Sequence, residues 1–246
     1  MLKNLFAKLG VGSTSVDAVL MTDHFCPGGT VEGVIKIDGG EVEQNISAIT
    51  LKLVTVAKSE GEDVDLNLNH AIAEYRIAEA FTVKPGDKLE RPFSFQLHPE
   101  TPVTILDVAN NRCKVWLETA LDIDMAMDPT DRDYLNIHPS PVVSKFIDAM
   151  EKNGFKMIKA DVEKGFLRGD GFESRSGCYQ EIEFKPSGFG FSRIREVELS
   201  FIMDIDHTHV LIELDRAFSG DGYISLTVPS NADHDKIESD LKAILG

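Results

Sequence analysis

The sequence has few of the residues that cross-link secreted domains or hold structural metals. Its 246 residues include three cysteines, Cys26, Cys113 and Cys178, which lie far apart and form no C-x-x-C pair. An odd number of cysteines without paired spacing argues against a disulfide framework and a zinc knuckle. All three are therefore expected to be small buried side chains, and a reducing cytoplasm is the compartment that this usage favours.

Long apolar runs are also lacking. No stretch approaches the ~20 apolar residues of a membrane-spanning helix, so no integral membrane segment is expected. The first twelve residues place Leu2, Leu5, Phe6 and Leu9 at helical spacing but have no apolar run or cleavage site of a signal peptide. This N-terminal helix is expected to pack on the core or between domains. Peripheral contact with a partner or a membrane surface is the alternative interpretation.

Basic residues are outnumbered, with 25 Lys and Arg against 41 Asp and Glu, which gives a formal net charge of -16. Such a surface repels phosphate backbones and anionic lipids unless a basic patch offsets it, and the sequence contains no such patch. Nucleic acid is therefore excluded as an expected partner. The 42% apolar content is enough for a sizeable core, and the length accommodates two sandwich domains of roughly 100 residues each.

Two Pro-Gly sequences precede strand-like segments in the first half. They are Cys26-Pro27-Gly28-Gly29 and Val83-Lys84-Pro85-Gly86-Asp87. Because proline fixes φ and glycine accepts positive φ, each predicts a sharp turn directly before a strand. Gly33 interrupts the alternation that follows the first turn. A glycine at such a position predicts a bulge or a close approach of neighbouring chain.

Alternation of apolar and polar residues predicts strands through the rest of the first half. Ile49, Leu51 and Leu53, for example, alternate with Thr50 and Lys52. This period of two is typical of antiparallel sheets. The pattern predicts one antiparallel sandwich with strands near 15–22, 30–37, 46–59, 71–83, 89–97 and 114–127.

A helix opens the second half and another closes it. Ser140 is suited to cap the first helix, Pro141 to its first position and Gly154 to its end, which predicts a helix over 141–153. The closing helix is predicted over 231–245, with Ile237, Leu241 and Ile244 on one face. Strands are predicted between the helices at 155–166, 178–185, 194–205, 210–215 and 222–228.

The turns and strands together resemble a known family. The first Pro-Gly strand and the later segment 93–102, FSFQLHPETP, resemble two motifs that recur in the N-terminal domain of arrestin-like proteins. With segments 116–119, 128–135, 180–185 and 211–216, essentially the whole chain resembles the bacterial sporulation-control family of the stage-zero protein M type. The resemblance implies an all-β fold of two tandem arrestin-like antiparallel sandwiches, at residues 1–128 and 129–246. Short helices would lie at the N-terminus, at the start of the second domain and at the C-terminus.

An acidic stretch follows the last strand of the first half. Its members are Asp122, Asp124, Asp128, Asp131 and Asp133. By analogy with arrestins, these side chains are expected to make polar contacts at the domain junction. The alternative is an exposed linker that Pro129, Pro139 and Pro141 keep extended.

The densest set of potential metal ligands is Asp204, Asp206, His207 and His209, named here the Asp-His cluster. Aspartate and histidine suit zinc or another divalent ion, but a site needs three or four converging groups. On a continuous strand the aspartates and histidines would face opposite sides, and a hairpin here is equally a polar turn. The cluster thus supplies candidate metal ligands without predicting a metal site, and no cofactor is expected.

No catalytic motif stands out. The sequence contains no G-x-S-x-G elbow, and none of its glycine pairs joins a strand to a helix with the lysine of a phosphate loop. The first hypothesis is therefore a non-enzymatic cytoplasmic regulator or scaffold that binds protein partners through sandwich edges and loops. The second is a metal-dependent ligand-binding or hydrolytic sandwich that uses the Asp-His cluster. A monomer or weak homodimer is expected, since the large like charge opposes association of sheet edges.

Overall fold

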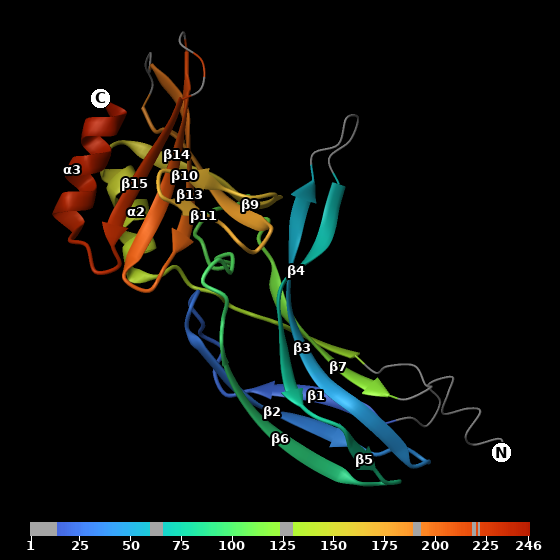
Figure 1. Cartoon of the computed structure of the whole chain (residues 1–246). Coiled ribbons are helices and arrows are strands. Elements are labelled where there is room, and N and C mark those ends of the chain that lie inside the picture. Colours follow the sequence, from blue (N-terminus) through green and yellow to red (C-terminus); the bar gives the residue numbers. More distant parts are fainter. Residues whose placement is uncertain (1–13, 60–65, 124–129, 189–192, 218–219, 221) are drawn as a thin grey trace.

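A computed structural model describes residues 14–59, 66–123, 130–188, 193–217, 220 and 222–246. The predicted N-terminal helix lies outside these residues, as do Asp124 and Asp128. Strands dominate the chain and two helices are described, which confirms the all-β class (Figure 1). Neither of these helices is long and apolar enough to cross a membrane.

The N-terminal half is a sandwich of two antiparallel layers. One layer has the order β1-β2-β6, formed by β1 (Ser15–Leu20), β2 (Thr30–Asp38) and β6 (Lys88–Gln96). The other layer is built around β3 (Gln44–Ser59), with β7 (Val115–Ile123) and β8 (Thr130–Tyr134) on one side and β4 (Leu66–Ala78) and β5 (Phe81–Val83) on the other. Apolar side chains at alternate positions of both layers, such as Ile35 and Leu51, are fully buried in one core between them.

Both Pro-Gly turns form as the sequence predicts. The backbone N–H of Gly29 donates to the Cys26 carbonyl at 2.9 Å, and Gly28 has a φ of 73°. The second turn repeats this geometry, with Gly86 at a φ of 74°. Gly33 marks a close approach and not a bulge, because β2 keeps its register with both neighbours. A Cβ atom at Gly33 would lie 2.5 Å from the Phe93 ring.

The C-terminal half pairs one sheet with two helices. The sheet has the order β15-β14-β13-β12-β9, from β9 (Phe155–Lys164), β12 (Cys178–Pro186), β13 (Ile194–Met203), β14 (His207–Arg216) and β15 (Gly222–Pro229). The short strands β10 (Arg168–Gly169) and β11 (Phe172–Glu173) form a separate hairpin. The helices α2 (Pro141–Lys152) and α3 (His234–Leu245) cover one face of the sheet (Figure 1). In the described part of this half, the second layer is therefore helical.

The cap of α2 explains where this layer begins. The Ser140 side chain accepts a hydrogen bond from the Val143 N–H, Pro141 takes the first position and Gly154 turns the chain away at a φ of 82°. Phe146 and Met150, on the inner face of α2, are fully buried. The predicted first helix is confirmed, whereas α3 starts three residues later than the sequence indicates.

One sheet runs through both halves. β9 meets β3 in a parallel pair at Lys58 and Glu163, so the five C-terminal strands continue into β3, β7 and β8. Residues 130–134, within the segment 128–135, form β8, which pairs with β7. A boundary between 128 and 129 would assign β8 to the second domain. Its pairing instead groups it with the N-terminal half, and the chain passes to the second half between β8 and α2.

Candidate functional site at the junction of the two halves

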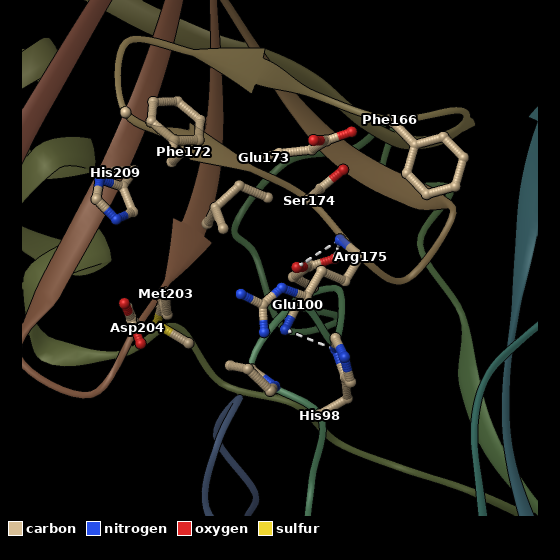
Figure 2. A pocket seen from close by; sticks show the side chains of 13 residues that line it. His98, Glu100, Phe166, Phe172, Glu173, Ser174, Arg175, Met203, Asp204 and His209 are labelled. Atoms are coloured by element: carbon tan, nitrogen blue, oxygen red, sulfur yellow. Dashed lines mark hydrogen bonds between the residues drawn. The ribbon is translucent and has the colours of Figure 1, made fainter.

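A cleft of about 720 Å³ lies where the two halves meet. The segment 98–100 from the N-terminal half forms one wall, while the β10–β11 hairpin and the turn between β13 and β14 form the others (Figure 2). Its lining mixes charged, polar and apolar side chains. A surface of this kind fits a polypeptide segment better than a small apolar ligand.

Glu100 lines the cleft and joins the two halves. Its carboxylate accepts hydrogen bonds from the backbone N–H groups of Arg175, at 2.9 Å, and Ser176, at 2.8 Å. The Glu100 N–H in turn donates to Nδ1 of His98 at 3.2 Å (Figure 2). Burial lowers the pKa of His98, which favours the neutral ring that this acceptor role requires. The arrangement holds the loop after β11 against the segment that follows β6.

A second tether lies behind the first. The side-chain amide of Gln180 donates to the Val103 carbonyl at 2.7 Å and accepts from the Val103 N–H at 2.9 Å. The same amide nitrogen lies 2.9 Å from Sγ of Cys113, whose pKa is raised by burial to about 12. That thiol is therefore protonated and structural. Cys26, Cys113 and Cys178 are all free, and the latter two are buried.

The opposite wall holds part of the Asp-His cluster. His209 stacks on Phe172 with ring centroids 4.7 Å apart, and its Nδ1 lies 2.9 Å from Oγ1 of Thr227. Burial also lowers the pKa of His209. Oδ1 of Asp204 accepts from the Ile205 N–H, while Asp206 and His207 are exposed on the turn.

No three of these four side chains converge on a common point in the described structure. Among the described residues, two sets of acidic side chains bring potential ligand atoms within 4.8 Å of one another, and neither includes a member of the Asp-His cluster.

The acidic stretch lies elsewhere as well. Oδ2 of Asp131 accepts from the Ala18 N–H at 3.2 Å, so its described hydrogen bond reaches β1 of the same half. Asp133 lies nearby, and burial together with Asp131 and Asp17 raises its pKa to about 6. Asp122 is exposed on β7. Polar contacts between the halves are instead made by other residues, among them Glu100 and Gln180, which the sequence did not single out individually.

The outer edges of the long sheet differ in character. β8 carries Asp131, Arg132 and Asp133, and charged residues on an edge discourage pairing with another chain. β15, with the sequence GYISLTVP, has no charged residue and pairs on one side only, with β14, in the part of the chain that the structure describes. The β10–β11 hairpin links this strand to the cleft, since the Asp170 N–H donates to Oγ of Ser225 at 3.2 Å.

The fold and this junction define an arrestin-like β-protein. The family model described as SpoOM protein matches residues 2–218 of the chain. The chain therefore belongs to the SpoOM protein family. The sporulation-control protein spo0M of Bacillus subtilis (strain 168) is 32% identical over 219 residues, which is 89% of this chain and 81% of that protein. The crystal structure of Spo0M from Bacillus subtilis superimposes with a TM-score of 0.85 at 28% identity and covers 96% of this chain and 98% of that one.

Proposed function

We propose that this chain is a non-enzymatic regulatory protein that acts in the cytoplasm by binding a protein partner. An extended segment of the partner would add to the open edge of β15, and the loops around the cleft would contact its flanks. Membership of a family named for sporulation control supports the regulatory part of the proposal. The uncharged edge of β15 is the observation that carries the binding part.

Strand addition suits this edge for a physical reason. The backbone N–H and C=O groups on an open edge attract a further strand, and most proteins protect such edges with lysine, proline or other charged residues. Within β15, Pro229 at its end is the one residue of this protective kind, and Tyr223 on the strand is 63% exposed. Main-chain hydrogen bonds would supply affinity for the partner, while Tyr223 and neighbouring side chains would supply selectivity.

Two tyrosines of nearly equal exposure provide a matched experiment. Tyr223 lies on β15 and is 63% exposed, while Tyr134 lies on the charged edge strand β8 and is 62% exposed. We would compare the full chain with its Tyr223→Lys and Tyr134→Lys variants in cross-linking and affinity purification from the native host. Tyr223→Lys is expected to lose the captured partner at an unchanged melting temperature, whereas Tyr134→Lys keeps it. Capture of the same proteins by both variants, or of none by the unmodified chain, would refute the proposal.

Edge pairing between two copies of the chain is the competing outcome. Light scattering after gel filtration distinguishes it, because a homodimer through β15 doubles the mass and Tyr223→Lys restores the monomer. The proposal requires a monomer or a weak homodimer that the partner displaces. A tight homodimer through β15 would leave no edge for a partner and would contradict it.

A further inference from the structure

The open face of the C-terminal sheet carries an unusual density of carboxylates. Alternate residues of its strands face α2 and α3, so the residues between them share the other face. Register pairs place Glu181 opposite Asp161, Glu183 opposite Glu198, and Glu198 opposite Glu213. Eight carboxylates therefore lie on four neighbouring strands: Asp161, Glu163, Glu181, Glu183, Glu196, Glu198, Glu213 and Asp215.

Three of these carboxylates converge where the two halves join. Potential ligand oxygens of Asp161, Glu163 and Glu181 all lie within 4.8 Å of one another. Glu163 is also the residue that pairs with Lys58 at the contact between β9 and β3. The three oxygens therefore meet beside the register pair that connects β9 to β3.

The lysines on this face do not balance its charge. Lys159 contacts Oδ2 of Asp161 at 2.8 Å and also pairs with Glu183, and Lys58 contacts Glu163 at 3.2 Å. Nζ of Lys185 forms an ion pair with Oε2 of Glu196 at 2.9 Å. Among the described residues, these three lysines thus face eight carboxylates. Among the described residues no basic side chain pairs with Glu181, whose pKa is raised to about 8 by burial and by the surrounding carboxylates.

Asp161 supplies an independent sign of a missing ligand. Its side chain is 5% exposed, and although Lys159 takes Oδ2, the buried Oδ1 accepts no hydrogen bond within the described part of the chain. A buried carboxylate oxygen without a partner loses its hydration and gains nothing in return. A cation in front of Oδ1 would remove that penalty. Asp161 is also one of the three residues whose potential ligand oxygens converge.

We propose that Asp161, Glu163 and Glu181 form a binding site for a hard divalent cation, with Ca²⁺ as the best match. The site offers carboxylate oxygens only, which hard cations prefer over nitrogen or sulfur ligands. Two oxygens that bind Ca²⁺ at about 2.4 Å each lie at most about 4.8 Å apart, so the observed spacing accommodates the ion without rearrangement. The smaller Mg²⁺ retains water more strongly and fits a site of three protein carboxylates less well. Bound Ca²⁺ would tie β9 and β12 together beside the Lys58 contact and so stiffen the join between the halves.

Calorimetric titration with CaCl₂ tests the site directly. The full chain, treated with a chelator and then dialysed, is titrated at pH 8.5 in 150 mM KCl, a background that suppresses diffuse attraction to the acidic surface. We expect one saturable equivalent of Ca²⁺ and a melting temperature that rises with the CaCl₂ concentration. The same titration with MgCl₂ should give at least tenfold weaker binding. This site does not depend on partner binding, so either proposal can fail without the other.

Two variants distinguish a specific Ca²⁺ site from diffuse attraction of Ca²⁺ to the acidic surface. Glu181→Gln removes one ligand charge at a position without an ion pair and is expected to weaken Ca²⁺ binding at least tenfold. Glu213→Gln removes one charge from the same face outside the three ligands and should bind within twofold of the unmodified chain. Equal loss in both variants, unchanged binding by Glu181→Gln, or no saturable binding by the unmodified chain would overturn the proposal. Both substituted residues are partly exposed, and circular dichroism verifies that the variants fold.

Discussion

Gln180 and Val103 join the two halves of the molecule through a pair of hydrogen bonds, with the Gln180 amide acting as donor and acceptor to one backbone unit. A side-chain amide that satisfies both groups of a peptide unit fixes distance and orientation together. Glu100 adds a second fixed point by accepting from two consecutive N–H groups, those of Arg175 and Ser176. Polar contacts of defined geometry therefore set the position of one half on the other in addition to apolar packing.

The Gln180→Ala variant tests the first tether. It leaves the N–H and C=O of the buried residue Val103 without partners, and each buried unpaired group costs about 1–3 kcal/mol. We expect the free energy of unfolding to fall by about 2–3 kcal/mol in chemical denaturation. Gln96→Ala, at an exposed position, is the control and should change the value by less than about 0.5 kcal/mol. Equal stability of the two variants would mean that the tether contributes nothing.

The Glu100→Ala variant tests the second tether. Hydrogen bonds to a charged acceptor contribute about 1.5–3 kcal/mol, so losing them should increase local opening of the loop at least about tenfold. Amide hydrogen exchange at Arg175 and Ser176 measures this opening. Glu173→Ala, which removes only an exposed pair with Arg168, should leave both exchange rates unchanged. Unchanged exchange in Glu100→Ala would contradict the assigned role.

The raised pKa of Asp133 leads us to expect that the stability of the protein depends on pH. Burial and the neighbours Asp131 and Asp17 raise its pKa from 3.8 to about 6 in the folded protein. The folded state therefore binds this proton more tightly than the unfolded state, and the contribution of Asp133 to stability is lost as pH rises from about 4 through 6. After a discount for partial exposure, we expect Asp133→Asn to stabilise the protein by about 1 kcal/mol at pH 8 and to leave stability at pH 4 nearly unchanged. Chemical denaturation curves between pH 4 and 8 measure the free energy of unfolding of both proteins. An Asp133→Asn variant no more stable at pH 8 than the unmodified chain would contradict the prediction.

Substitution of Gly33 is expected to cause a severe packing defect. A Cβ atom there would lie 2.5 Å from the Phe93 ring and 2.7 Å from the Val19 carbonyl oxygen, and the backbone carbonyl cannot move without disturbing β1. Overpacking of this kind typically costs about 1–3 kcal/mol, so Gly33→Ala is expected near the upper end of that range. Gly188→Ala, where no atom lies within 4 Å, is the matched control. Comparable melting temperatures for the two variants would show that the close approach relaxes freely.

Local patterns predicted local structure well. The Pro-Gly turns, the Ser140 cap and most strands follow from residues adjacent in sequence, where proline, glycine and alternation act directly on the backbone. The strand β8 was not predicted, because its residues TDRDY carry no apolar alternation and depend for their strand conformation on pairing with β7. The C-terminal half carries the two helices that the sequence predicts, but sequence periodicity does not tell which face of the sheet they cover.

The amino-acid sequence alone determined the all-β class, the turns before β2 and β6, the two helices and the family resemblance, since each depends on short-range preferences or on motifs of contiguous residues. Only the tertiary structure decided which distant residues meet. Glu100 reaches residues 175 and 176, Gln180 reaches Val103, and Asp161, Glu163 and Glu181 converge, whereas the Asp-His cluster stays dispersed despite being contiguous in sequence. The reason is that a site requires side chains to converge in space, and convergence between β6, β9 and β12 is fixed by strand register and by the join at Lys58 and Glu163.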